Sequence, residues 1–197
     1  MTALPKFAPA RMTVAEFLEW PGDGSHVRHQ LVDGEIRAMA PASIRHGRIQ
    51  ANAVRLLGNH LEGSRCEVVV APGVVPRIQS ETNLRIPDLG VTCEIDESGQ
   101  QSLLNPVLLV EILSPSNENE TRENVWSYTT IPTVREILLI HSTGVAAELL
   151  ERQADGEWPT DPRLLGPEDA LHLPSIDFSC PLIALYRGTR LADQALS

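Results

Sequence analysis

Two apolar runs with a polar segment between them stand out in the hydrophobic pattern of the chain. The first begins at 106, passes through Glu111, and ends at the breaker Ser114-Pro115-Ser116. The second occupies 136–140. Short β-branched apolar runs bounded by turn residues are typical of buried strands, so we expect strands at 107–113 and 134–141. Similar runs predict further strands at 66–71, 86–91 and 145–151, and shorter ones at 74–78 and 170–173.

Helical spacing of apolar residues predicts three helices. The first begins after Thr13, which together with Glu16 has the sequence of a capping box. The longest covers 43–61, with Ser43 as its N-cap and Gly63 just beyond its end. The third covers 118–130 and stops before Pro132, because the residue before a proline disfavours helical geometry. A last helical turn is expected at 181–186.

An Asp-Gly pair lies between two strand-like segments, 29–32 and 35–39. It predicts a β-hairpin, because a type I′ turn needs positive φ at both central positions. Residues 1–11 show no periodicity, so we expect a loose arm there and one domain over 12–197. The order of helix, hairpin, long helix, strands, helix and strands predicts an α+β (or α/β) domain with a mixed sheet flanked by helices.

The chain is acidic, with 16 Lys and Arg against 26 Asp and Glu and a net charge of −10. Such a chain exerts no long-range attraction on nucleic acid. The balance argues against a protein that binds nucleic acid through bulk charge. It is compatible with a small metal-assisted site that offsets the charge locally. Hydrophobic residues make up 42% of the sequence, which is enough for an ordinary core.

Three cysteines, Cys66, Cys93 and Cys180, are far apart in the sequence and form no CxxC pair. Their apolar neighbours favour buried, reduced thiols over a zinc site. The N-terminus lacks the continuous apolar segment of a signal peptide. No apolar run approaches the roughly 20 residues that a membrane span needs. We therefore expect a cytoplasmic protein without a membrane segment.

Three acidic residues lie at predicted strand ends: Glu35, Asp88 and Glu111. A carboxylate at the tip of a buried strand is costly unless it binds something, and Glu111 has the most apolar neighbours. Two carboxylates at adjacent strand ends can hold Mg²⁺, which keeps waters and phosphate oxygens as its other ligands. Asp88 with Glu111 would suffice, with Glu35 nearby. A solvated strand end is the alternative for each acid.

His46 lies in the first turn of the long predicted helix, beside Arg45 and Arg48. It could shuttle protons, or it could contact a metal-binding acid without binding the metal itself. The alternative is a partly exposed histidine near a helix start. The three residues form a compact basic cluster, and helix N-termini favour phosphate, although a solvated helix face would look the same. The sequence has no Walker loop and no GxGxxG, GxSxG or HExxH motif.

Four segments follow one another in a distinctive order: HQLVDGEIRAMAP, IPDLGV, PVLLVEILSPSN and IPTVREILLI. The helix with His46 follows the first, and a helix ending at Tyr128 precedes the last. This order, from about Met12 to Tyr186, resembles the bacterial Uma-type family of predicted restriction endonucleases, part of the PD-(D/E)XK nuclease superfamily. The resemblance implies a restriction-endonuclease-like fold, a mixed central sheet with a helix on either face.

The resemblance also implies roles for individual residues. Asp88 and Glu111 would jointly hold Mg²⁺ or Mn²⁺, with the main-chain carbonyl of Ile112 as a further ligand. Glu35 and His46 would lie beside the metal. A metal held in this way polarises the scissile phosphate and lowers the pKa of a bound water.

The chain departs from the family pattern at the third catalytic position. Leu113 stands where the superfamily motif has lysine, and in similar families the lysine has moved to the next helix, four residues before a tyrosine. Counting back from Tyr128 gives Asn124, an i, i+4 neighbour on the same helix face. Arg122 is about 200° away around the helix and should point elsewhere. A further departure is Gln30, where the family often has glutamate.

Two functions follow from this resemblance. The first is a metal-dependent DNA endonuclease with weak activity, because the neutral Asn124 can hold a water but supplies no charge. Loss of one such electrostatic donor costs on the order of 10²–10³ in rate. The second is a catalytically silenced relative that acts as a DNA- or protein-binding module. A homodimer would let two sites face two DNA strands.

Overall fold

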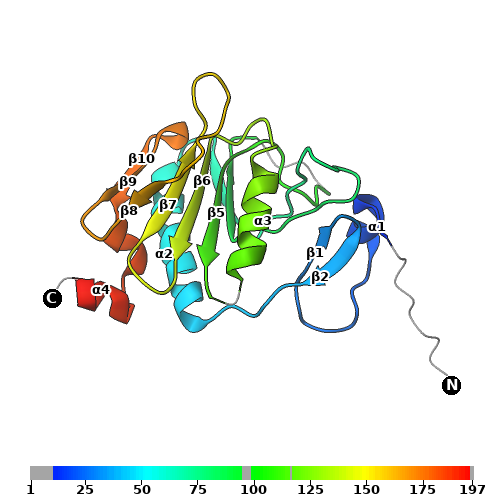
Figure 1. Ribbon diagram of the computed structural model, residues 1–197, viewed down its shortest axis with the longest axis horizontal. Helices are drawn as coiled ribbons and strands as arrows, with labels where there is room; N and C mark the ends of the chain where they lie inside the picture. The colour runs from blue at the N-terminus through cyan, green and yellow to red at the C-terminus, as the bar shows by residue number, and fades with distance from the viewer. Residues whose placement is uncertain (1–10, 95–98, 116, 196–197) are drawn as a thin grey trace.

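Six strands form a mixed sheet at the centre of the computed structural model, which describes residues 11–94, 99–115 and 117–195 (Figure 1). Their order across the sheet is β3-β4-β5-β6-β7-β8. The strands are β3 (Glu67–Val70), β4 (Leu89–Thr92), β5 (Pro106–Leu113), β6 (Glu136–His141), β7 (Ala147–Glu151) and β8 (Arg163–Leu165). The predicted α+β class with a mixed sheet is confirmed.

The two apolar runs of the sequence become the neighbouring strands β5 and β6, which pair in parallel, whereas the other neighbours in this sheet pair antiparallel. Parallel strands need a crossover connection, and here α3 (Glu118–Tyr128) lies within it. Strands covered on both faces read as continuous apolar runs. β5 is buried at every position except Val107, which explains why its sequence shows no alternation.

Helices cover the two faces of the sheet (Figure 1). The even-numbered residues of β5, such as Leu108 and Ile112, pack in a core with α2 (Ile44–Leu61) and the C-terminal segment. The odd-numbered residues, such as Leu109 and Leu113, pack in a second core with Tyr128 of α3. This division follows from the period of two along a strand, and it turns the odd-numbered Glu111 toward α3.

An N-terminal layer lies beside the sheet, made of α1 (Val14–Glu19) and the hairpin of β1 (His29–Val32) and β2 (Glu35–Ala38). The predicted capping box between Thr13 and Glu16 is present. The predicted turn is confirmed as well, with φ of 51° at Asp33 and 82° at Gly34. The predicted arm, apart from Arg11, lies outside the described residues.

The C-terminal segment packs against α2. It contains a second hairpin, two 3-10 turns and a short helix: β9 (Ala170–Leu173), η1 (Pro174–Ile176), β10 (Phe178–Pro181), η2 (Leu182–Tyr186) and α4 (Arg190–Ala195). The hydrophobic pattern predicts β9 and the turn at η2, but not β8, β10 or α4, which are too short to show a period. The segment 74–78 forms a single bridge, from Val74 to Arg85, and no regular strand. Among the described helices, none has the length and apolar character to cross a bilayer.

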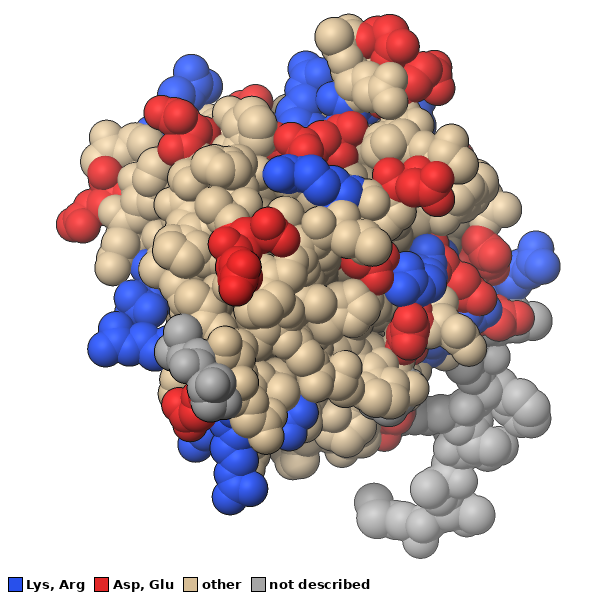
Figure 2. All heavy atoms as spheres, turned by 60° about the vertical axis from the view of Figure 1, so that its left-hand side comes forward, with Lys and Arg blue, Asp and Glu red and all other residues tan. Residues whose placement is uncertain are grey.

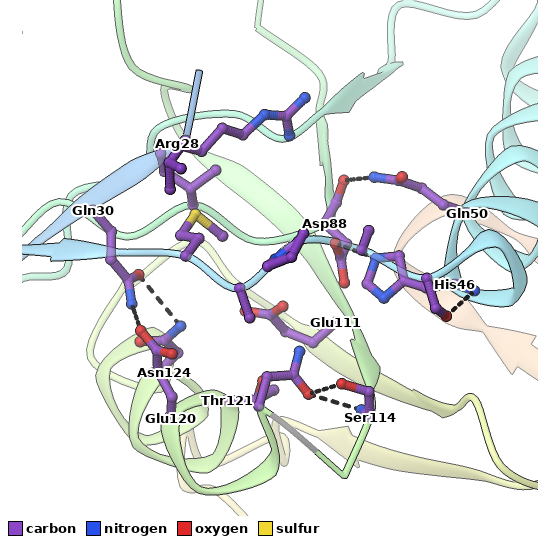
Figure 3. Close-up of a pocket in the computed structure, with 18 of the residues that line it drawn as sticks. Arg28, Gln30, His46, Gln50, Asp88, Glu111, Ser114, Glu120, Thr121 and Asn124 are labelled. Atoms are coloured by element: carbon purple, nitrogen blue, oxygen red, sulfur yellow. Dashed lines mark hydrogen bonds and ion pairs between the residues drawn. The ribbon is translucent and has the colours of Figure 1, made fainter. Parts of the chain in front are cut away.

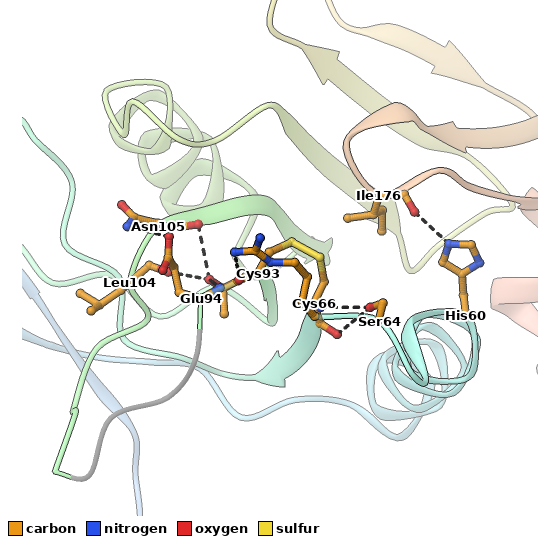
Figure 4. Close-up of a disulfide and its surroundings, with 10 residues drawn as sticks. His60, Ser64, Cys66, Cys93, Glu94, Leu104, Asn105 and Ile176 are labelled. Carbon is orange, nitrogen blue, oxygen red and sulfur yellow. Dashed lines mark hydrogen bonds between the residues drawn. A yellow bond between two sulfur atoms is a disulfide. The ribbon is translucent and has the colours of Figure 1, made fainter.

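The prediction of three reduced thiols is wrong for two of the cysteines. Cys66 and Cys93 form a disulfide, with their Cα atoms 3.8 Å apart (Figure 4). β3 pairs with β4 so that Glu67 faces Thr92, and the next pair in this register is Cys66 with Cys93. The separation of 27 residues hides this pairing in the sequence. Cys180 is free and buried, as expected.

We expect the Cys66→Ser variant to lose about 2–4 kcal/mol of unfolding free energy, because the disulfide restricts the unfolded chain. Urea denaturation followed by circular dichroism measures the loss. A reductant should destabilise the wild type by a similar amount and leave the Cys66→Ser/Cys93→Ser variant unchanged. Equal stability of wild type and variants under oxidising conditions would contradict the expectation.

Candidate functional site

A cavity of about 410 Å³ opens between the N-terminal hairpin, the start of α2, the adjoining ends of β4 and β5, and α3 (Figure 3). Four of the predicted site residues line it: His46, Asp88, Glu111 and Asn124. They come from four separate segments of the chain, and the fold brings their side chains to one place. Figure 3 shows His46 and Asp88 side by side, with Glu111 next to them.

Asp88 immediately precedes β4. Leu89 pairs with Val110, so continuing the antiparallel register by one position sets Asp88 opposite Glu111. The Asp88 carboxylate is held from two sides: Oδ2 accepts a 2.7 Å hydrogen bond from the Ile112 amide, and Oδ1 lies 2.9 Å from Nε2 of His46. The proximity that the sequence predicts for Asp88 and Glu111 is therefore a consequence of strand pairing.

Glu111 lies on β5 with only 5% of its surface exposed. The hydroxyl of Tyr128 donates a 2.7 Å hydrogen bond to its Oε1. Burial and, after it, the charge of Asp88 raise the pKa of Glu111 well above its ordinary range, while hydrogen bonds from Tyr128 and Asn124 act in the opposite direction. A buried carboxylate that lies next to a second acid is a typical arrangement for binding a cation.

α3 presents Asn124 and Tyr128 to the cavity from successive turns, as their spacing predicts. Asn124 is buried, and its Nδ2 donates to Oε1 of Gln30 at 3.4 Å. Nε2 of Gln30 in turn donates to Oε1 of Glu120 at 2.6 Å. The carbonyl Oδ1 of Asn124 is buried and has no hydrogen-bond partner among the described residues. Gln30 and Glu120 thus belong to the site, although the sequence gives no periodic or motif signal for Glu120.

His46 is buried in the first turn of α2. Its backbone amide donates to Oγ of Ser43, which confirms Ser43 as the N-cap. The cap fixes the start of α2 beside the cavity, and the imidazole reaches Asp88. Gln50, one turn further, donates to the main-chain oxygen of Asp88 at 3.0 Å. The start of α2 therefore positions Asp88 through both its side chain and its backbone.

The structure does not bring Glu35 to this cavity. Glu35 is exposed on β2, where it pairs with Val32 next to the turn, and it does not line the cavity. The hairpin contributes Gln30 instead, which is 1% exposed. The main chain of Ile112 does belong to the site: its amide binds Asp88, and its carbonyl accepts from Nδ2 of Asn117 at 3.5 Å.

The residues of the cavity fit a divalent cation. Within residues 11–94, 99–115 and 117–195, no three His, Cys, Asp or Glu side chains converge as a ready-made metal site. Mg²⁺, however, usually takes only one or two carboxylates and completes its shell with water and phosphate oxygens. Asp88 and Glu111 supply that pair at the wall of the cavity.

Arg122 points away from the cavity, as its position on the helix predicts. Its guanidinium donates to both carboxylate oxygens of Glu148, at 3.1 and 2.9 Å, and also to Glu118. Nε2 of His141 lies 2.9 Å from Glu148 as well. Hydrogen bonds from Arg122 lower the pKa of Glu148 against the opposing effect of burial. This cluster fastens α3 to β7 and so sets the place of Asn124.

We expect Glu148→Gln to cost about 1–3 kcal/mol of unfolding free energy at neutral pH, because charge-assisted hydrogen bonds to Arg122 are weakened. The folded-state pKa of Glu148 is lowered, so this stabilisation is present above the unfolded pKa and is lost as the pH falls through the folded value. Urea denaturation at pH 7 and pH 3 tests both points. Glu118→Gln, which removes an exposed i, i+4 pair, should cost under about 0.5 kcal/mol.

Comparison with known proteins finds a matching family model, similar sequences and a solved structure with the same fold. The Uma2 family model, described as "Putative restriction endonuclease", matches residues 14–182. The uncharacterized protein slr1290 of Synechocystis is 32% identical over 188 residues, which is 93% of each chain. The uncharacterized protein sll1609 of the same organism is 28% identical over 151 residues, covering 75% of this chain and 84% of the relative.

A solved structure shares the fold. The crystal structure of "a putative nuclease belonging to DUF820" from Anabaena variabilis superposes with a TM-score of 0.72 at 17% identity, over 89% of this chain and 97% of that one. The family match and this superposition both extend over most of the chain. Residues 14–182 include every residue of the cavity described above.

Proposed function

The chain belongs to the Uma2 family, and from this premise we propose that it is a metal-dependent DNA endonuclease that hydrolyses phosphodiester bonds at the cavity of Asp88 and Glu111. A nuclease-like function follows from the family; the metal, the residues and the substrate are the proposal. One observation carries it: Glu111 is buried next to Asp88 with a raised pKa. A pair of acids in this position lowers the stability of the fold unless a bound cation offsets its charge.

In this proposal Asp88 and Glu111 hold one Mg²⁺ or Mn²⁺, with the carbonyl of Ile112 as a further ligand. A cation bound there polarises the scissile phosphate and lowers the pKa of a water. His46 and the Ile112 amide orient the Asp88 carboxylate. Tyr128 fixes Glu111 from the opposite side. These fixed side chains hold the acids in place before substrate arrives.

The charge of the chain shapes how DNA would bind. Because the net charge of −10 gives the chain no overall attraction for DNA, the attraction must come from a local site. On the face in Figure 2, Lys and Arg side chains are interspersed with Asp and Glu, without a continuous basic surface on that face. Arg28 lies at the cavity, where its guanidinium is suited to a phosphate. A second copy of the chain would double such contacts, so we propose that the protein is a homodimer. We also propose that it acts in the cytoplasm.

A second function is favoured by one specific observation. Asn124 occupies the place where the family resemblance leads us to expect a lysine, and an amide supplies no positive charge to the transition state. A chain that keeps the fold and the acids but lacks this charge could bind DNA or protein without cleaving. The competing proposal is therefore a catalytically silenced binding module.

Incubation with supercoiled plasmid separates the two proposals. We expect the wild type to nick plasmid in Mg²⁺ or Mn²⁺ and to lose this activity in EDTA. The Asp88→Asn protein, purified in parallel, should leave the plasmid intact. If the wild type cleaves no plasmid at high enzyme concentration with either metal, the silenced module is correct; if Asp88→Asn cleaves equally well, the proposed site is wrong.

A further inference from the structure

We propose that DNA enters the cavity as an unpaired nucleotide, so that the protein acts on single strands, loops and locally opened duplexes and not on closed duplex DNA. The base would lie on an apolar wall of the cavity, and the phosphate would lie at Asp88 and Glu111. We rest this inference on the proposed function, because it names the form of DNA that the same site would take.

One wall of the cavity is apolar. Two stretches of chain build it at the open end of the N-terminal hairpin, 26–28 and 39–42, and the amide of Met39 donates a 2.8 Å hydrogen bond to the carbonyl of Arg28 between them. The apolar residues of this wall are Val27, Met39, Ala40, Pro41 and Ala42. Val27 is 46% exposed, and residues 40–42 are exposed as well. Neighbouring apolar residues that stay exposed at a cavity indicate a binding surface.

The opposite side of the cavity is polar and acidic. Asp88, Glu111 and the α3 residues Glu120 and Thr121 line it. Figure 3 shows Arg28 on one side of Asp88 and Glu111, and Glu120 with Thr121 on the other. The cavity thus combines an apolar wall with a pair of acids suited to a cation. A nucleotide has the same division, with a flat base at one end and a phosphate at the other.

A base can reach an apolar wall only when it is unpaired. In a duplex each base is stacked between its neighbours and paired along its edge, so its faces are covered. Proteins that bind single strands use the free face of the base, which packs against side chains, most strongly aromatic ones, with little dependence on sequence. The apolar wall would therefore gain contact with a single strand and none with a closed duplex.

The size of the cavity agrees with one nucleotide. Its volume of about 410 Å³ lies within the range of roughly 300–1,000 Å³ of pockets that enclose small molecules. The acids are recessed in it, because Glu111 is 5% exposed and the side chain of Asp88 is 16% exposed. A phosphate must enter the cavity to reach them. The flexible backbone of a single strand can follow it there without bringing a partner strand.

The charges at the cavity agree with a ligand that is held partly through its base. Among the described residues that line the cavity, Arg28 is the only Lys or Arg. Arg45 and Arg48 each donate from Nη1 to a main-chain carbonyl at 2.9 Å, that of Ser142 and that of Gly188. A duplex, with one phosphate charge per ~1.7 Å of its axis, is held largely by many Lys and Arg contacts. Few such contacts are available here, so contact with a base must supply part of the affinity.

Fluorescence anisotropy tests the preference directly, at one fixed salt concentration and with Ca²⁺ in place of Mg²⁺ so that the DNA stays intact. The probes are a labelled oligonucleotide as a single strand, the same strand in a duplex, and a duplex with an unpaired loop. We expect the single strand and the loop to bind at least about tenfold more tightly than the duplex, which is the effect of one stacked base.

Val27→Trp enlarges the apolar wall at an exposed position. It should tighten binding of the single strand about fivefold or more, because an unpaired base stacks on an aromatic ring, and should leave duplex binding unchanged. Val27→Ser combined with Met39→Ser should weaken single-strand binding. Val70→Trp is the matched control: Val70, on β3, is 48% exposed and does not line the cavity, so this variant should bind as the wild type does.

The outcomes separate this inference from the proposed endonuclease. Equal binding of single strand and duplex, or unchanged single-strand binding by Val27→Trp, would overturn the inference and leave the endonuclease to the plasmid assay. If the single strand is preferred but no DNA is cleaved in Mg²⁺ or Mn²⁺, the inference stands and the silenced binding module replaces the endonuclease. If the wild type binds no form of DNA, both fall.

Discussion

Replacing Asn124 by lysine is expected to raise the rate of plasmid cleavage about 10²–10³-fold at saturating Mg²⁺, because it restores one electrostatic donor to the site. The new ammonium would lie on the same face of α3 as Tyr128, beside Glu111. The ammonium could donate hydrogen bonds to Glu120 and Gln30, which lie beside position 124. The cavity of about 410 Å³ leaves room for the longer side chain.

Initial rates of nicking, measured over a range of Mg²⁺ concentrations, distinguish turnover from cation affinity. The maximal rate should rise while the Mg²⁺ concentration for half-maximal rate also rises, because the ammonium opposes the cation. Asn119→Lys adds the same charge to an exposed position of α3 and should change neither quantity appreciably. An unchanged maximal rate in a folded Asn124→Lys protein would show that charge at this position is not what limits cleavage.

Glu111→Gln should abolish cleavage and at the same time stabilise the protein by about 1–3 kcal/mol at pH 8. Loss of a carboxylate removes a proposed cation ligand. It also removes a buried acid next to Asp88 that at pH 8 must either carry an unfavourably desolvated charge or hold a proton that the unfolded chain has lost. Glutamine keeps an acceptor for the Tyr128 hydroxyl, so the replacement leaves that hydrogen bond in place.

The pH dependence gives this prediction a definite sign. The folded-state pKa of Glu111 is raised, so above the unfolded pKa of about 4.3 the native state holds a proton that the unfolded state has lost. Stability is therefore greatest below that value and falls as the pH rises toward the folded-state pKa. The Gln variant lacks this contribution. Its advantage over the wild type should grow from pH 4 to pH 8.

Thermal unfolding at several pH values, with and without Mn²⁺, measures both effects. Mn²⁺ should stabilise the wild type at pH 8 and leave Glu111→Gln nearly unaffected. Glu67→Gln, at an exposed position of β3, is the matched control and should follow the wild type. A Gln variant that is less stable than the wild type at pH 8 would mean that the carboxylate is stabilised by contacts other than those described.

The proximity of Asp88 and Glu111 could be predicted from the sequence because both lie at the ends of strands that the hydrophobic pattern locates. Apolar runs locate β4 and β5, and their antiparallel pairing brings Asp88 to Glu111. The spacing of four residues on α3 likewise relates Asn124 to Tyr128. The helical period thus predicts correctly that Asn124 and Tyr128 lie on one face of α3.

Other features depend on contacts that no local pattern encodes. Glu35 has the same strand-end appearance as Asp88, yet the hairpin turns Gln30 to the cavity and leaves Glu35 in solvent. The disulfide depends on the register of an edge pair whose members are 27 residues apart. Glu120 enters the site through its bond with Gln30, 90 residues away in the chain. Such pairings arise from tertiary packing alone.

The crossover between β5 and β6 has a consequence for the order of folding. Asn124 and Tyr128 lie on the connection between two parallel strands, and Asp88 and His46 reach the same point from earlier segments. Contacts between distant parts of a chain form slowly, because the loops between them must close first. A nascent chain that ends before α3 therefore carries both acids without the helix that holds Glu111 through Tyr128.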